Sequence, residues 1–412
     1  MSPSDRTPIL KEVKVTRLEP SRRRQTVMLL ACAYLHFTSL GFTSVLGVAY
    51  VELLRHFQCN RSEAAVVQSI FSGLVNIGGI IFSRVVTKHG IGIPVMIASL
   101  IGSASMFFST FSVNIYMVIS LVGVVCGLSM SINYLSGFVA VGWTFFSSRR
   151  AALSFLTMAT AVGQTFLPNV ADALISEYSW TGLFIISAGI MLNGIPCGLV
   201  LHLSKTYFYK GQPSTSSDAK VCQFQSKLDV AFILLAILCT IYSGTAAVES
   251  WFIVDLSVLR GFSRQAGTLL LSLVGAFGLG GRLIGTIILK LYPNIRIAVP
   301  MTVAFMGLGA AHMVVILFTN YYGMMVGVVM RGLSIGLVMA SIQPIQLELR
   351  GLEAFPQTVA LCNVLTGCGL ALCGYIWGSI ADWTGGYELP FYIATGFAVL
   401  DAITVAIIRC LQ

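Results

Sequence analysis

Long apolar stretches separated by short polar ones run through most of the chain. Twelve of them reach roughly twenty residues or more, the length that a helix needs to cross a hydrocarbon core of about 30 Å. Because lipid offers no hydrogen-bond partners to the backbone, each stretch is predicted to be a helix rather than a strand. The predicted membrane spans are residues 26–54, 64–86, 92–111, 115–145, 151–175, 181–203, 229–254, 267–289, 297–318, 322–342, 358–381 and 390–408.

Two polar segments give this series its larger organisation. Residues 1–25 are polar and basic and are predicted to form a cytoplasmic arm. Residues 205–228 are poor in apolar side chains and rich in turn formers, which predicts a cytoplasmic linker. We therefore expect an all-α membrane protein with a six-helix bundle at residues 26–204 and a second one at residues 229–412.

Composition and charge agree with a membrane protein. Hydrophobic residues make up 56% of the chain and charged residues 10%, far below the quarter that is typical of soluble domains. The net charge of +9 follows a topological pattern: with the N-terminus inside, four of the 25 Lys and Arg residues lie outside and two lie in the membrane, which leaves 19 on the cytoplasmic side. The positive-inside rule thus places both termini in the cytoplasm, and no nucleic-acid partner is expected.

The two halves carry a faint internal repeat. Gly78-Gly79-Ile80 in the second predicted span recurs as Gly280-Gly281-Arg282 in the eighth, and each is followed by a lysine at the same distance. Gly127-Leu128-Ser129 in the fourth span recurs as Gly332-Leu333-Ser334 in the tenth. Both matches fit a duplication of six spans, a common origin of transporter folds. The counterpart of Arg282 in the first half is the apolar residue Ile80. The fold itself therefore does not require a cation at that position.

Arg282 is the main candidate for a functional residue. It lies inside the apolar, glycine-rich run 270–290, where a charge costs several kcal/mol unless it is paired or wetted. Its planar donor fork matches the two oxygens of a carboxylate. Two interpretations follow, an anchor for an anionic substrate or a structural ion pair.

Other polar residues inside the predicted spans are weaker candidates. His36 is either a proton shuttle or a ring that bonds a neighbour, while Asn133, Tyr134 and Trp251 either line a cavity or pack. Gly281 and Gly285 are expected to allow close helix packing.

The remaining ionisable candidates are predicted to form ion pairs or to take part in coupling. Arg331 and Asp401 lie deep in their spans, so pairing that fixes the C-terminal bundle is expected for both. Glu249 and Asp172 lie toward the outer ends of theirs and are expected to reach water.

Several motifs resemble those of one family. Residues 142–153 hold the adjacent Arg149 and Arg150, which mark topology at least, and Gly163 and Pro168 follow them; further matching segments are 47–53, 180–184 and 380–387. This ordered set, spread over roughly residues 25–405, is similar to the monocarboxylate transporters (solute carrier family 16) of the major facilitator superfamily.

The resemblance implies facilitated, often proton-linked, transport of small carboxylates across the plasma membrane by alternating access, and an ancillary single-span membrane partner. It also implies three charged site residues, of which only Arg282 is present. Ser44 stands in place of the family's first-span lysine, and Gly278 in place of its eighth-span aspartate. We therefore expect transport of a small organic anion or amino-acid-like solute, without assuming proton coupling.

Two alternatives stay open at this point. The chain is an uncoupled facilitator or exchanger of a neutral or zwitterionic solute, or a receptor or scaffold that retains the fold without transporting. An enzyme is not expected, since no cluster of nucleophile, base and acid occurs in the sequence. No cofactor or metal is expected either, because the ten cysteines lack ligand spacing.

Overall fold

The computed structural model describes residues 21–145, 149–204, 230–292 and 295–411. Within these ranges the chain forms helices joined by short turns. The helices are α1 (Arg22–Phe57), α2 (Arg61–His89), α3 (Gly92–Phe108), a 3-10 turn (Ser109–Phe111), α4 (Ile115–Val118), a π-helical stretch (Ile119–Cys126), α5 (Gly127–Thr144), α6 (Arg149–Leu192), α7 (Gly194–Leu203), α8 (Val230–Leu259), α9 (Arg264–Leu291), α10 (Ala298–Leu317), α11 (Tyr321–Thr384) and α12 (Glu388–Leu411).

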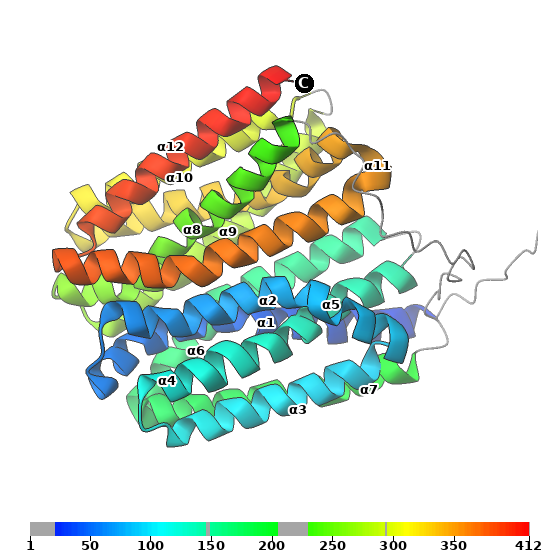
Figure 1. The fold of residues 1–412 in the computed structure, drawn as a ribbon, viewed down its shortest axis with the longest axis horizontal. Coiled ribbons are helices and arrows are strands. Elements are labelled where there is room, and N and C mark those ends of the chain that lie inside the picture. Colours follow the sequence, from blue (N-terminus) through cyan, green and yellow to red (C-terminus); the bar gives the residue numbers. More distant parts are fainter. Residues whose placement is uncertain (1–20, 146–148, 205–229, 293–294, 412) are drawn as a thin grey trace, which may run out of the picture.

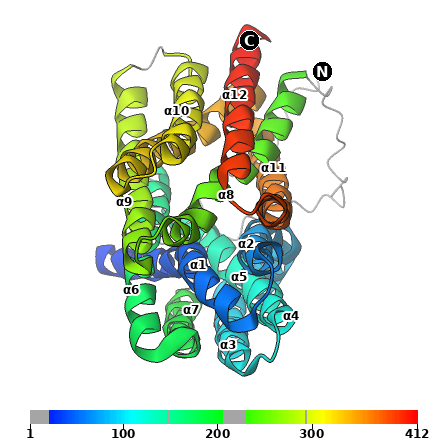
Figure 2. The same cartoon turned by 90° about the vertical axis from the view of Figure 1, so that its left-hand side faces the viewer.

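The helices form two groups that lie against each other. Helices α1–α7 make one group and α8–α12 the other, with most helices running along the long axis of the molecule (Figure 1). The view turned by 90° shows the same separation (Figure 2). The groups meet chiefly where α2 packs on α11 and α6 on α9. The predicted linker 205–228 and residues 1–20 of the predicted arm lie outside the described residues, and residues 22–25 of that arm already belong to α1.

The spans agree with the sequence prediction in number but not at every boundary. Eleven described stretches are long and apolar enough to cross a membrane. One of them, Phe155–Leu203, has 49 residues, more than twice the length that one crossing needs. Its helix α6 bends at Ser179, whose φ is 61°. The fifth and sixth predicted spans are therefore joined through this single non-helical residue instead of a short loop, and the fold has twelve spans.

The described structure repeats one packing contact in both halves. Gly127 of α5 approaches Phe71 of α2, and a Cβ there would lie 3.1 Å from the Phe71 Cα. Gly332 of α11 approaches α9 in the same way, with Val274 O at 2.9 Å from the equivalent Cβ position. The fourth span thus packs on the second as the tenth packs on the eighth, through the glycines that the sequence repeat singled out.

A seam of small residues joins the two groups along α2 and the second span of α11. A Cβ on Gly73 would lie 2.8 Å from Gly367 O, and one on Gly374 would lie 2.7 Å from Ala65 O. Farther along, Gly378 lies against the backbone of Ser62. The two helix backbones therefore touch almost directly over several turns.

Gly281 offers a test of close packing within the C-terminal group. A methyl group at this position would overlap Leu333 O, whereas one at Gly189 would have no atom within 4 Å. We expect Gly281→Ala to cost about 1–3 kcal/mol by overpacking and to lower the thermal midpoint of the detergent-purified protein. Gly189→Ala should leave the midpoint unchanged or raise it, because alanine favours a helix by up to about 1 kcal/mol over glycine. Equal midpoints for the two variants would contradict this packing.

Candidate functional site

A cavity of about 100 Å³ lies where the two groups of helices meet. This volume is several times what a single water molecule needs. Both groups contribute to its wall, the first through α1 and α6 and the second through α8, α9 and α11. Four of the predicted site residues are among those that line it: Ser44, Trp251, Arg282 and Arg331.

Arg282 lines this cavity with one hydrogen bond and one unpartnered nitrogen. Its Nη1 donates to the Thr157 carbonyl oxygen at 2.6 Å, a bond from α9 to α6 that crosses between the groups. Its Nε is buried and has no hydrogen-bond partner among the described residues. None of the ion pairs in the described part of the chain includes Arg282. A guanidinium with five donors and one carbonyl acceptor can still receive an anion.

Arg331 is the second cation of the cavity wall, and it is paired. Its Nε lies 3.4 Å from Glu249 Oε2, and its Nη2 donates to Ser250 Oγ at 2.6 Å and to the Ala246 carbonyl oxygen. On the other side of Glu249, His312 Nε2 lies 3.6 Å from the same Oε2 atom. Glu249 and His312 are fully buried. Arg331 thus contacts the Glu249 carboxylate on one side and lines the cavity on the other.

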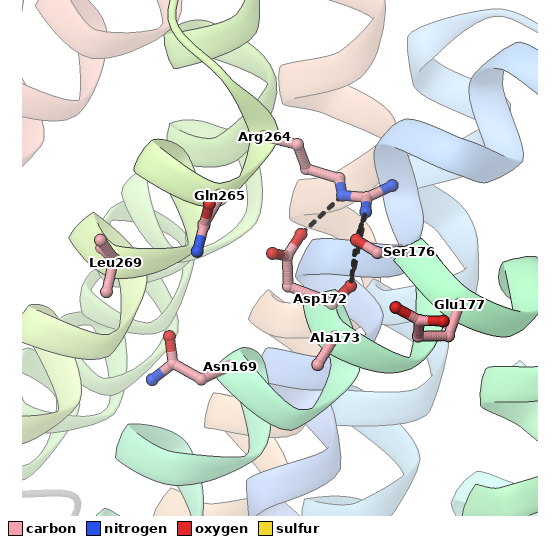
Figure 3. A pocket seen from close by; sticks show the side chains of 8 residues that line it. All are labelled: Asn169, Asp172, Ala173, Ser176, Glu177, Arg264, Gln265 and Leu269. Atoms are coloured by element: carbon pink, nitrogen blue, oxygen red, sulfur yellow. Dashed lines mark hydrogen bonds and ion pairs between the residues drawn. The ribbon is translucent and has the colours of Figure 1, made fainter.

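Ion pairs also join the two groups at the end of the molecule opposite the C-terminus, which we call the far end. Here Arg264 of α9 reaches two carboxylates of the N-terminal group, Glu52 and Asp172, at 2.6 Å each. Its Nη2 also donates to Ser176 Oγ at 2.8 Å. Figure 3 shows the side chain of Arg264 extending from α9 to α6 beside a pocket of about 520 Å³. We refer to Glu52, Asp172, Ser176 and Arg264 as the Arg264 cluster.

A second far-end network surrounds Tyr387. The Tyr387 hydroxyl donates to Asp255 Oδ2 at 2.6 Å, and the Tyr50 hydroxyl lies 3.2 Å from it. Burial holds the pKa of Tyr387 well above its ordinary value, and the nearby Tyr50 and Asp255 raise it further, so the phenol stays a donor. Asp382 lies near the C-terminal end of α11. Its carboxylate accepts hydrogen bonds from the backbone N–H groups of Arg61 and Ser62 at 2.9 Å each. This carboxylate of α11 therefore caps the N-terminus of α2 in the other group.

Comparison with known proteins identifies the family. The model of the Major Facilitator Superfamily matches residues 32–349, well over half of the chain. The chain belongs to the Major Facilitator Superfamily.

Relatives within this superfamily confirm the narrower resemblance. Monocarboxylate transporter 6 of Mus musculus is 24% identical over 405 residues, covering 92% of this chain and 86% of the relative. Monocarboxylate transporter 3 of Gallus gallus is 22% identical, with 92% and 77% covered. Among solved structures, an inward-facing, unoccupied bacterial homologue of the human lysosomal transporter Spinster superposes with a TM-score of 0.74 at 12% identity, covering 94% of this chain and 98% of that one. The relatives and the fold are those of transporters rather than enzymes.

Three predicted site residues, His36, Asn133 and Tyr134, are not among the residues that line the cavity. His36 is buried between Tyr134 and Phe138, with ring centroids 4.8 and 4.4 Å away. Asn133 donates to Ser99 Oγ at 3.2 Å inside the N-terminal group. Helix geometry explains the difference for His36 and Asn133, whose side chains lie on faces that pack within their own group, whereas Tyr134 is close enough to Arg282 of α9 to interact with its charge.

The charged residues differ in part from the sequence prediction. Glu249 was expected to reach water, but it is fully buried because α8 extends to Leu259, five residues beyond the predicted end of the span. Arg331 pairs with Glu249, whereas the buried carboxylate oxygens of Asp401 have no hydrogen-bond partner among the described residues. Asp172 lies toward the outer end of its span as expected, but it was also expected to reach water, and instead it is buried and paired with Arg264. Sequence alone gave no signal for His312 beside Glu249.

The two adjacent arginines singled out in the sequence, Arg149 and Arg150, begin α6, but their side chains lie outside the described part of the structure. Gly281 and Gly285 pack against α11, the latter with a Cβ position 2.6 Å from the Ala340 Cβ. Over the described ranges, no group of three or more His, Cys, Asp or Glu side chains is arranged to hold a metal ion.

Asp382 allows a test of the cap between the two groups. Asp382→Ala removes the acceptor of two N–H bonds of α2, and we expect a loss of about 1–3 kcal/mol, seen as a lower thermal midpoint in detergent. Asp382→Asn keeps one acceptor oxygen and should fall between the wild type and the alanine variant. A wild-type midpoint for Asp382→Ala would show that the cap contributes nothing.

Proposed function

We propose that the chain transports a small organic anion, a monocarboxylate or an amino-acid-like solute, by alternating access, with Arg282 as the anion anchor. The main support is one observation: Arg282 faces the cavity between the two groups and no described carboxylate neutralises it. A guanidinium without a carboxylate partner at the wall of a buried cavity favours a planar carboxylate, which it can hold by two parallel bonds. The small cavity favours a small solute.

The balance of charge supports an anion rather than a cation. The cavity wall holds two arginines, and one carboxylate, Glu249, lies behind one of them. One positive charge therefore remains uncompensated near the cavity. Burying such a charge costs several kcal/mol, and a bound anion would offset that cost.

The far end supports the proposed alternating access and membrane orientation. The positive-inside count favours an extracellular far end and two cytoplasmic termini, and by analogy with the relatives we propose that the chain lies in the plasma membrane. The Arg264 cluster and the network around Tyr387 both link the two groups of helices there, which supports a conformation that is closed toward the outside. The inward-facing state of the similar Spinster homologue agrees with this reading. Transport then requires both clusters to open.

A second candidate, a neutral or zwitterionic solute, also has an observation in its favour. Ser44 and Gly278, which stand where related transporters would carry charges, both line the cavity beside Arg282. A serine hydroxyl and a bare backbone can accept or donate hydrogen bonds without adding charge. Amino acids and creatine are therefore included among the test solutes.

The anchor is tested by uptake of radiolabelled lactate, pyruvate, aromatic amino acids and creatine into cells that express the chain, at two external pH values. Arg282→Ala should reduce uptake of the transported solute by about tenfold to a hundredfold, because charge-assisted bonds contribute about 1.5–3 kcal/mol. Arg282→Lys, which keeps the charge without the fork, should be intermediate. Arg409→Ala, at the exposed end of α12, is the matched control at equal surface abundance. Equal uptake by Arg282→Ala and wild type refutes the anchor.

The closed far end is tested with a cysteine reporter in the cavity. We expect an impermeant thiol reagent outside the cell to label Ser44→Cys slowly, and about fivefold faster when Arg264→Ala is added, for a shift of about 1 kcal/mol toward the open state. Arg55→Ala is the control, since Arg55 meets Glu52 at 3.8 Å within α1 and is mostly exposed. The chain without the reporter gives the background of its own cysteines. No difference between the two arginine variants would exclude the Arg264 cluster as a barrier.

A further inference from the structure

Glu249 has surroundings unlike those of any other described carboxylate in the chain. It lies on α8 with both contacts on one oxygen, Arg331 Nε at 3.4 Å and His312 Nε2 at 3.6 Å. Both of its oxygens are buried and without a hydrogen-bond partner among the described residues, so these two contacts are ion-pair contacts and not hydrogen bonds. The carboxyl group is thus held between a permanent cation and an imidazole, with its capacity for hydrogen bonds unused. We infer that the Glu249 carboxyl group can be protonated or ionised without a large rearrangement of the residues around it.

Few other titratable groups face it. From α11 it meets Arg331 and from α10 it meets His312. On α8 itself, Tyr242 lies two turns earlier and interacts with Arg331 and with Asp401 of α12. Helix α9 contributes Arg282, which lines the same cavity as Arg331. From α1, α9 and α12, no described side chain forms an ion pair or hydrogen bond with Glu249.

Arg331 connects this buried carboxyl to the cavity. Its guanidinium lines the cavity together with Ser250 and Trp251, the two residues that follow Glu249 in the chain. Glu249 itself is fully buried behind this wall. Arg331 is therefore within reach of a solute in the cavity on one side and of Glu249 on the other.

An anion in the cavity would compete with ionised Glu249 for the same cation. Two negative charges around one guanidinium in a dry site repel each other, and the group that can take up a proton is favoured in its neutral form. Binding of the anion thus favours protonation of Glu249, and by linkage protonation of Glu249 favours binding of the anion to the same degree. The two ligands would move together without direct contact.

We propose that Glu249 is the proton-carrying group of this transporter and that Arg331 couples its protonation to occupation of the cavity by a carboxylate. The inference rests on the proposed function. In each cycle the Glu249 carboxylate accepts one proton from water on one side and releases it to water on the other, together with one substrate anion. No other bond forms or breaks.

The central experiment uses the full chain in proteoliposomes with radiolabelled lactate and pyruvate as probes. With an inward proton gradient of about one pH unit, the wild type should accumulate the transported probe about tenfold, the limit for one proton per anion. Glu249→Gln should lose this accumulation and only equilibrate the probe, while exchange of probe between equal concentrations on both sides persists. Asp401→Asn, which neutralises the other deeply buried carboxyl of the C-terminal group, should still accumulate the probe.

The outcomes distinguish a failure of the proposed monocarboxylate transport from a failure of the proposed proton coupling. No flux of either probe in the wild type overturns the proposed monocarboxylate function, and the coupling falls with it. Flux with equal proton-driven accumulation in wild type and Glu249→Gln overturns the coupling alone. Loss of accumulation in Asp401→Asn but not in Glu249→Gln would assign the proton to Asp401 instead.

A measurement on the unmodified chain covers the case in which Glu249→Gln fails to fold. A hydrophobic carbodiimide adds to protonated carboxyl groups, and mass spectrometry locates the adduct. Labelling of Glu249 should fall severalfold as pH rises and should increase when lactate is added at constant pH. Labelling that responds to neither pH nor lactate would overturn the proposal.

Discussion

The arrangement of the cavity depends on the cost of keeping the guanidinium of Arg282 away from water. An apolar bundle can hold such a charge only if its donors find acceptors. The Thr157 carbonyl satisfies one of them from the opposite group of helices, Nε has no hydrogen-bond partner among the described residues, and no described carboxylate pairs with the guanidinium. The charge therefore both holds the two groups together at this level and leaves a demand for an anion.

Charged residues lie at two levels, and they serve different purposes. At the far end, Arg264 meets two carboxylates and Asp382 caps α2, so this cation and this helix terminus each have a partner in the opposite group. At the cavity the balance is incomplete, with two arginines and one carboxylate. Under the proposed function, the ion pairs at the far end would close the molecule there, whereas the incomplete pairing would leave the centre able to bind an anion. The same residue types would then form a barrier at one level and a site at the other.

The sequence predicted the architecture well because length and apolar composition alone decide whether a helix spans a membrane. Arg282 was equally accessible to sequence reasoning, since one cation in an apolar run is conspicuous. Two kinds of feature were not. The bend at Ser179 replaced a predicted loop, because one residue with φ of 61° has no clear signature in an apolar context. The meeting of Glu249, Arg331 and His312 depends on the faces of three helices, which spacing along one chain does not reveal.

The seam between α2 and α11 has a mechanical consequence. Where large side chains interdigitate, a change in the angle between two helices forces each side chain from one socket to the next, and motion proceeds in steps. Along Gly73, Gly367, Gly374 and Gly378 the contacts are mostly with backbone atoms and small side chains such as Ala371 and Ser69, and Ile77 is the one large apolar side chain among them. Two helix surfaces with mostly small side chains can tilt against each other while they stay in contact. If the two halves rock as proposed, this seam would let them turn with few side chains having to change position.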